Sequence, residues 1–154
     1  MATLKTGNKA PAFTGLDQDG NKVSLKDFAG KTLILFFYPK DMTSGCTAEA
    51  CNLRDNYAEL IRNGYAVVGV SPDPASSHLK FISKYTLPFP LIADTDQSIC
   101  SKYEAWGEKS MYGKKYMGVI RKTFVISPEG KILHIIDKVK TDDHASQILA
   151  LETA

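Results

Sequence analysis

The chain has 154 residues, of which 44% are hydrophobic and 23% charged, a composition typical of a single soluble globular domain. Its 19 basic and 17 acidic side chains give a formal net charge of +2 and form no dense basic cluster, which argues against a nucleic-acid-binding protein. No apolar run is long enough to cross a bilayer, and residues 1–13 lack the apolar core of a secretory signal, so no membrane or secretory segment is expected.

The cysteine count points to a reducing compartment. Three cysteines are too few, and an odd number, for a disulfide-stapled scaffold. In a reducing cytosol, a pair of cysteines is more often catalytic or redox-sensing than structural. We therefore expect one cytoplasmic domain over residues 1–154.

The N-terminal part of the chain predicts a β-hairpin followed by a buried strand. The sequence DQDG at 17–20 is a turn signal, with 23–25 as the second arm of the hairpin. Residues 31–39 then form a continuous apolar run, typical of a central strand buried on both faces. Pro39 ends this strand because proline has no N–H to donate to a sheet.

Helices and strands alternate in the rest of the chain. The pattern predicts, in order, a helix over 44–64, a strand over 65–73, a helix over 74–86, a strand over 88–94, a helix over 96–105, a β-hairpin over 122–137 and a helix over 142–152. This order predicts an α/β fold with a central mixed β-sheet flanked by helices on both faces and an N-terminal β-hairpin.

The stretch YPKDMTSGCTAEAC, residues 38–51, is the strongest chemical signal in the chain. It places Cys46 in the first turn of a helix that follows a buried strand. Free N–H groups and a partial positive charge at a helix N-terminus favour a thiolate, which is the nucleophilic form of cysteine. Thr43 offers a hydroxyl to the same region, and Pro39 shapes the loop before it. The polar context TSGCT is unlike that of a core cysteine, so we interpret Cys46 as a reactive thiol.

Pro39, Thr43 and Cys46 match the P-x-x-x-T-x-x-C signature of peroxiredoxins. The chain resembles their atypical two-cysteine subgroup, peroxiredoxin Q, also called bacterioferritin comigratory protein. Its residues 7–25 resemble the N-terminal segment of that subgroup, and CTAEAC at 46–51 resembles its cysteine pair. Residues 106–126 resemble a later block of the family, which here places Arg121 just before a strand.

The resemblance implies a thioredoxin-like fold and reduction of hydrogen peroxide and organic hydroperoxides without metal, flavin or haem. It implies that Cys46 is the peroxidatic and Cys51 the resolving cysteine. Thr43 and Arg121 would hold the peroxide and polarise its O–O bond, and Pro39 would complete the pocket. Thioredoxin is the implied reductant, and a monomer is the implied state.

This chemistry agrees with the residues themselves. Attack of a thiolate on a peroxide oxygen leaves a sulfenic acid, the first stage of cysteine oxidation. A cation such as Arg121 would stabilise both the thiolate and the charge that grows on the departing oxygen.

Two other function classes use the same features. A thiol–disulfide oxidoreductase also carries two cysteines at a helix start, but normally as Cys-x-x-Cys, which is absent here. A non-enzymatic redox sensor would oxidise without turnover. A third class, the cysteine hydrolases, would need a histidine near Cys46; His78 or His134 could supply it in space, but nothing local in the sequence supports it.

Several other residues of the chain also have structural interpretations. Cys100 reads as a half-buried helix cysteine, although it could be a second resolving partner. The histidines are scattered without metal-ligand spacing, so a zinc site is not expected. Glu49 could serve the helix cap. Trp106 and Tyr112 could either line the pocket mouth or pack elsewhere.

The spacing of Cys46 and Cys51 has a mechanical consequence. Positions i and i+5 of an ideal helix lie roughly 8.7 Å apart between Cα atoms. A disulfide needs Cα atoms within about 7 Å of each other. If Cys51 resolves Cys46, as the resemblance implies, the start of the helix must unwind first.

Overall fold

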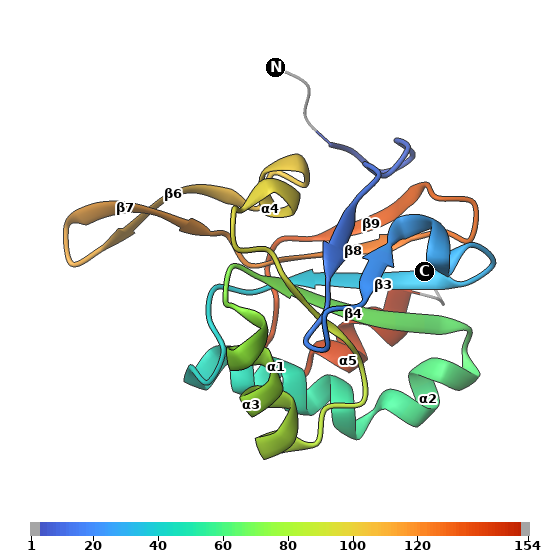
Figure 1. The fold of residues 1–154 in the computed structure, drawn as a ribbon. Coiled ribbons are helices and arrows are strands. Elements are labelled where there is room, and N and C mark those ends of the chain that lie inside the picture. The colour runs from blue at the N-terminus through green and yellow to red at the C-terminus, as the bar shows by residue number, and fades with distance from the viewer. Residues whose placement is uncertain (1–3, 152–154) are drawn as a thin grey trace.

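The computed structural model describes residues 4–151, and within this range the centre of the molecule is a five-stranded mixed sheet (Figure 1). In spatial order its strands are β5 (Leu91–Ala93), β4 (Tyr65–Ser71), β3 (Thr32–Phe37), β8 (Lys122–Ile126) and β9 (Ile132–Ile136). The first three run parallel, whereas β8 is antiparallel to both of its neighbours. The predicted mixed sheet with residues 31–39 at its centre is confirmed, as is the hairpin at 122–137.

Strand β3 forms part of both hydrophobic layers. Alternate side chains of a strand point to opposite faces of a sheet. Leu33, Leu35 and Phe37 therefore lie in one core cluster, and Ile34 and Phe36 lie in the other. The continuous apolar run is explained by burial on both faces.

Four of the helices in the described chain cover one face of the sheet (Figure 1). They are α1 (Ser44–Asp55), α2 (Tyr57–Arg62), α3 (Ala75–Tyr85) and α5 (His144–Ala150). The single helix predicted over 44–64 is wrong in one respect, because it is interrupted at Asn56, whose backbone has φ −108° and ψ 10°. The Asn56 side chain donates to the Asn52 carbonyl at 2.9 Å, a local bond of the kind that competes with helix hydrogen bonding.

The other face is covered by the N-terminal segment and one short helix. The predicted hairpin is present as β1 (Thr14–Leu16) and β2 (Lys22–Ser24), followed by a 3₁₀ helix, η1 (Leu25–Phe28). The Asp17 carboxylate fixes the turn by accepting hydrogen bonds from the N–H groups of Asp19 and Asn21, both at 2.9 Å. Helix α4 (Ser98–Lys102) completes this layer.

A hairpin that the sequence pattern did not predict projects from the body of the molecule (Figure 1). It consists of β6 (Trp106–Met111) and β7 (Lys114–Val119), joined by Tyr112 and Gly113 with φ 52° and 78°. Tyr112 is 98% exposed at its tip, whereas Trp106 packs against the core at its base. Tyr112 therefore does not line a pocket mouth.

Across residues 4–151, no helix combines the length and the apolar character needed to cross a membrane.

Candidate active site

Cys46 lies where the sequence predicts it, in the first turn of α1, with Thr43 at the N-cap position. Helix α1 starts shortly after β3 ends, so its N-terminus meets the carboxyl end of the central strand. The Cys46 side chain turns toward the sheet and is only 1% exposed, packed in the same cluster as Ala50 and Leu53. The thiol thus combines a helix N-terminus with a largely dry environment.

Arg121 contacts the sulfur from the neighbouring strand. It lies between β7 and β8, and β8 pairs with β3 so that Lys122 is opposite Phe37. Its Nη2 donates a hydrogen bond to Cys46 Sγ at 3.3 Å. A side chain at Gly45 would begin 3.2 Å from Nη2, so a glycine at this position leaves room for the guanidinium.

The Arg121 guanidinium stays charged in this setting. Burial alone would lower the pKa of Arg121, but negative charge on Cys46 and on Glu49 outweighs burial and raises it. A permanent cation beside the sulfur favours the thiolate.

Glu49 is a site residue that the sequence reading missed. Its side chain is not a helix cap but is fully buried and faces Arg121, whose Nη1 donates to Oε1 at 2.6 Å. Burial raises the pKa of Glu49 to about 7, against the opposing effect of the Arg121 charge. The helical spacing of three residues from Cys46 puts both groups on one face, which is the signal that could have revealed it.

A second buried layer lies behind Glu49. Its Oε2 has no hydrogen-bond partner, and His144 Nε2 approaches it at 3.6 Å, longer than a hydrogen bond. Thr123 Oγ1 lies 2.8 Å from the same Nε2, and Gln147 Oε1 lies 2.8 Å from Nδ1. Burial lowers the pKa of His144, so Nδ1–H donates to Gln147 while Nε2 accepts from Thr123.

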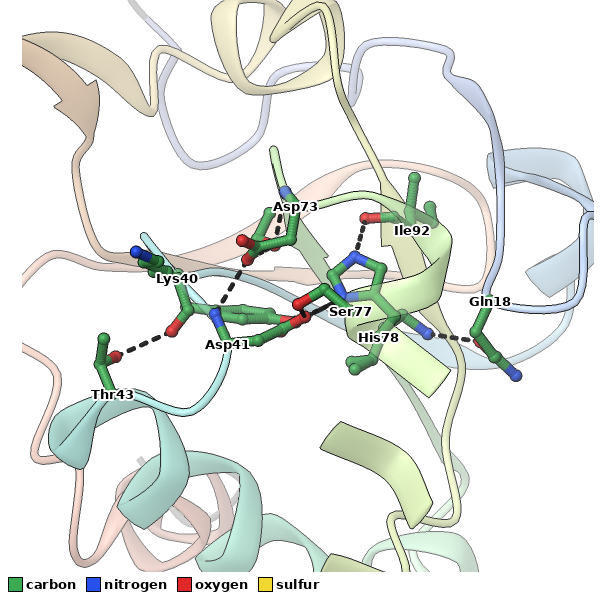
Figure 2. A network of polar contacts seen from close by, with 11 residues as sticks. Gln18, Lys40, Asp41, Thr43, Asp73, Ser77, His78 and Ile92 are labelled. Atoms are coloured by element: carbon green, nitrogen blue, oxygen red, sulfur yellow. Dashed lines mark hydrogen bonds and ion pairs between the residues drawn. The ribbon is translucent and has the colours of Figure 1, made fainter. Parts of the chain in front are cut away.

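Pro39 and Thr43 belong to the loop between β3 and α1. Pro39 is half-buried directly after Tyr38, and Thr43 is exposed. The Thr43 hydroxyl donates a hydrogen bond to the Lys40 carbonyl at 2.8 Å, within its own loop (Figure 2). The lone pairs of the hydroxyl oxygen therefore remain free to accept a hydrogen bond from another group. The structure therefore brings Arg121 into contact with Cys46, whereas Thr43 bonds its own loop.

All three cysteines are free thiols. Cys51 is half-buried on α1, which is helical from Ser44 to Asp55 and so keeps Cys51 five positions along the helix from Cys46. The expectation that Cys100 is half-buried is wrong, because it is 0% exposed. It packs in the cluster on the opposite face of the sheet from Cys46.

The surroundings of Cys100 disfavour its thiolate, which is the reactive form of a cysteine in redox chemistry. Burial raises the pKa of Cys100, and the Asp94 carboxylate adds to this effect. Cys100 therefore stays protonated, and the sheet separates it from Cys46.

Neither histidine considered as a base for Cys46 is bonded to its sulfur. His78 is bonded to Asp41 and to the Ile92 carbonyl. His134 is half-buried in β9. Within residues 4–151 the group bonded to the Cys46 sulfur is Arg121, which cannot act as a base.

An apolar cavity of the protein is remote from this chemistry. It has a volume of about 250 Å³ and is lined by Leu25, Leu33 and Ile126, at the opposite end of β3 from Cys46.

Comparisons with known proteins agree on one family. Residues 6–135 match the AhpC/TSA family. The chain is 45% identical to peroxiredoxin Bcp of Escherichia coli over 149 residues, covering 97% of this chain and 96% of that protein. It is also 45% identical over 145 residues to a putative peroxiredoxin of Mycobacterium tuberculosis, covering 94% and 92% of the two chains.

Solved structures give the same result. The bacterioferritin comigratory protein of Xanthomonas campestris, described for its alkyl peroxide reduction activity, superposes with a TM-score of 0.88 at 35% identity, covering 97% of this chain and 98% of that one. A cysteine-to-serine mutant of peroxiredoxin Q from Xylella fastidiosa has a TM-score of 0.91 at 28% identity, covering 99% and 98%.

Proposed function

The chain belongs to the AhpC/TSA family and is a thiol-dependent peroxidase, and we propose that its reaction takes place at Cys46 with Arg121 as the group that activates the sulfur. The observation that carries this proposal is the 3.3 Å hydrogen bond from Arg121 Nη2 to Cys46 Sγ at the start of α1. Helix terminus and guanidinium act on the same atom, and both favour the thiolate.

The first step is attack of the Cys46 thiolate on one peroxide oxygen. A sulfur–oxygen bond forms and the O–O bond breaks, so the sulfur is oxidised to a sulfenic acid while the other oxygen leaves as an alkoxide or hydroxide. The leaving oxygen takes a proton and departs as an alcohol or water. Arg121 stabilises the negative charge as it moves from sulfur to the leaving oxygen, and Pro39 and Thr43 border the peroxide at the loop.

The second step uses Cys51. Its thiol attacks the sulfenic sulfur, water leaves, and an intramolecular Cys46–Cys51 disulfide forms. An external dithiol then reduces this disulfide and is itself oxidised. We assign this role to thioredoxin, because the two-electron exchange between dithiol and disulfide is its chemistry.

The substrates proposed for this chain are hydrogen peroxide and organic hydroperoxides. The alkyl peroxide reduction activity attributed to the Xanthomonas campestris relative supports the second class. A single domain in a reducing cytoplasm fits three cysteines that are all free thiols.

Coupled turnover tests the proposal. With thioredoxin, thioredoxin reductase and NADPH, the wild-type protein should consume peroxide continuously, whereas the Cys51→Ser variant should stop after one equivalent. A protein that oxidises once without turnover would be a redox sensor. Efficient reduction of insulin without peroxide consumption would identify a thiol–disulfide oxidoreductase.

A further inference from the structure

A buried polar network lies beside the loop that carries Pro39 and Thr43 (Figure 2). Its centre is the pair Asp41 and His78, whose side chains are 1% and 0% exposed and whose Oδ2 and Nδ1 lie 2.7 Å apart. Asp41 also accepts hydrogen bonds from the Tyr38 hydroxyl at 2.6 Å and from the Ser77 hydroxyl at 2.8 Å. The Asp41 carboxylate therefore faces three donors.

The contacts of His78 determine its protonation. Its Nε2 lies 3.0 Å from the Ile92 carbonyl oxygen, which can only accept, so Nε2 must carry a proton. Its Nδ1 lies 2.7 Å from Asp41 Oδ2, and a second proton must lie between these two atoms. Tyr38 and Ser77 both stabilise the ionised carboxylate, so the second proton belongs to the imidazole.

Together with the neighbouring Asp73, this pair could in principle bind a metal ion, because one ligand atom from each of Asp41, Asp73 and His78 lies within 4.8 Å of the others. However, Asp73 Oδ2 already accepts from the Asp41 N–H at 2.8 Å and from the Ser71 hydroxyl at 2.7 Å. The imidazolium nitrogens have no lone pair left for a metal. Hydrogen bonds therefore account for these groups, with His78 as the cation facing two carboxylates.

The network holds a strained loop in place. Met42, which follows Asp41, has φ 68°, a left-handed conformation that is unfavourable for a side chain of this kind. Such a residue persists only where its surroundings fix it. Asp41 is fixed through both its side chain and its N–H, and next to Met42 the Thr43 hydroxyl closes the loop onto the Lys40 carbonyl.

We propose that Asp41 and His78 form a buried carboxylate–imidazolium pair that positions the loop Pro39–Thr43 against the peroxide at Cys46. The proposal rests on the proposed function, since it needs Cys46 as the reacting group. His78 is a positioning residue: it touches neither the sulfur nor the substrate, and it acts through Asp41 on the loop.

The protonation state is tested on the wild-type protein. Nitrogen NMR of the histidine rings at about pH 7.5 should show both ring nitrogens of His78 protonated, because its Nε2 faces a carbonyl oxygen and its Nδ1 faces a carboxylate. His134, half-buried in β9, is the internal reference. A neutral His78 ring under these conditions overturns the imidazolium assignment, and no substitution is needed to find it.

The positioning role is tested with Ser77→Ala and His78→Gln. Ser77→Ala removes one donor to Asp41 and keeps the core, and Ser76→Ala, exposed at the preceding position of α3, is its matched control. Two rates are compared: oxidation of Cys46 by peroxide, which needs the positioned loop, and alkylation by iodoacetamide, which needs the thiolate and access to it but no bound peroxide. Because small misplacements cost up to about 100-fold in rate, we expect the peroxide rate to fall about ten-fold or more in either variant, with alkylation within about two-fold.

Equal losses in both rates, or unchanged peroxide rates in the folded Ser77→Ala and His78→Gln proteins, would overturn the positioning role. The Cys46→Ser variant separates this failure from that of the proposed function. Continued peroxide consumption by Cys46→Ser would refute the proposed function itself. An inactive Cys46→Ser protein, together with unaffected Ser77 and His78 variants, would refute the positioning role alone.

Discussion

At the scale of single residues, the site depends on the Arg121 guanidinium, which bonds two side chains at once. Arg121 bonds Cys46 through Nη2 and Glu49 through Nη1, so the carboxylate fixes the orientation in which the cation meets the sulfur. A planar group with several donors can make both contacts at once, whereas a lysine ammonium is a single flexible point charge. The arrangement therefore favours arginine over lysine at position 121.

The first prediction concerns this choice. Arg121→Lys should reduce the thiolate fraction of Cys46 at neutral pH and slow its oxidation, and Arg121→Met should slow it further, by about 100-fold or more, as removal of a positioned donor does in other enzymes. Ultraviolet thiolate absorbance and stopped-flow oxidation measure the two effects. Lys122→Met, which removes the neighbouring charge, is the control. Equal titration curves and equal rates in all four proteins would reject the role of Arg121.

The second prediction follows from the burial of Glu49. Its folded pKa of about 7 exceeds the ordinary value of 4.5, so the folded protein holds a proton that the unfolded chain releases. The stability linked to this proton is fully present below pH 4.5 and is lost as the pH rises toward 7. The loss is about 3 kcal/mol, since one pKa unit corresponds to about 1.4 kcal/mol.

Urea unfolding of wild type and Glu49→Gln across this pH range measures the effect. The free energy of unfolding of the wild type, relative to the variant, should decline from pH 4.5 to above pH 7. A constant difference between the two proteins would show that Glu49 does not titrate in this window.

At the scale of secondary structure, the two steps proposed for α1 need two different conformations of this helix. Its N-terminus must be intact to present Cys46, yet Cys51 can reach Cys46 only after the helix opens, because the pair is too far apart on an ideal helix. Opening at a helix end disrupts few backbone bonds, which keeps its free energy low. The side chain of Asn52 opposes opening, since Asn52 Oδ1 accepts from the Ala145 N–H at 2.7 Å and Nδ2 donates to the Asp142 carbonyl at 3.1 Å.

The third prediction is the product of this opening. One equivalent of peroxide should give an intramolecular Cys46–Cys51 disulfide, with loss of hydrogen-exchange protection over residues 46–51. Peptide mapping and hydrogen exchange on the same sample test both parts. A link from Cys46 to Cys100, an intermolecular link, or unchanged protection in this segment would contradict the expected mechanism.

The fourth prediction uses Asn52 to change the rate of opening. Asn52→Ala removes both contacts with the α5 region, each worth about 1 kcal/mol, so the opened state should become about 10- to 30-fold more populated. Disulfide formation should accelerate, and more peroxide should be needed to over-oxidise Cys46, because the sulfenic acid is resolved sooner.

Asn63→Ala is the matched control for this prediction. Asn63 also bonds a backbone carbonyl, that of Glu59 at 2.8 Å, but it lies at the end of α2. Equal resolution rates in the two asparagine variants would show that the contacts between α1 and the α5 region do not govern opening.

At the scale of the whole molecule, the sequence predicts those helices and strands whose side chains are buried in a regular pattern along the chain. Strand β3 was found because its side chains are buried on both faces, and the N-terminal hairpin was found because Asp17 and Gly20 fix its turn. The β6–β7 hairpin was missed because most of β7 is exposed, so no alternation of polar and apolar residues marks it.

The residues that surround Cys46 could be predicted from the sequence only in part. Cys46 was found from its local motif and Arg121 from a family resemblance. Glu49 and Arg121 are 72 residues apart in the chain, and His144 reaches Glu49 from the C-terminal helix. Asp41 and His78 are likewise joined only by the packing of α3 against the end of β3. Contacts of this kind depend on the assembled fold, and the one local sign of them in the sequence is the three-residue spacing of Glu49 from Cys46 on α1.

Every step proposed for this protein requires Cys46 to be the reacting thiol. Peroxide consumption by the wild type, Cys46→Ser and Cys100→Ser tests it most directly, because both variants replace one buried cysteine by serine, on opposite faces of the sheet. We expect no turnover by Cys46→Ser and turnover within about three-fold of the wild type by Cys100→Ser, whose thiol stays protonated in the core. Substantial consumption by folded Cys46→Ser, or loss of activity confined to Cys100→Ser, would contradict the account.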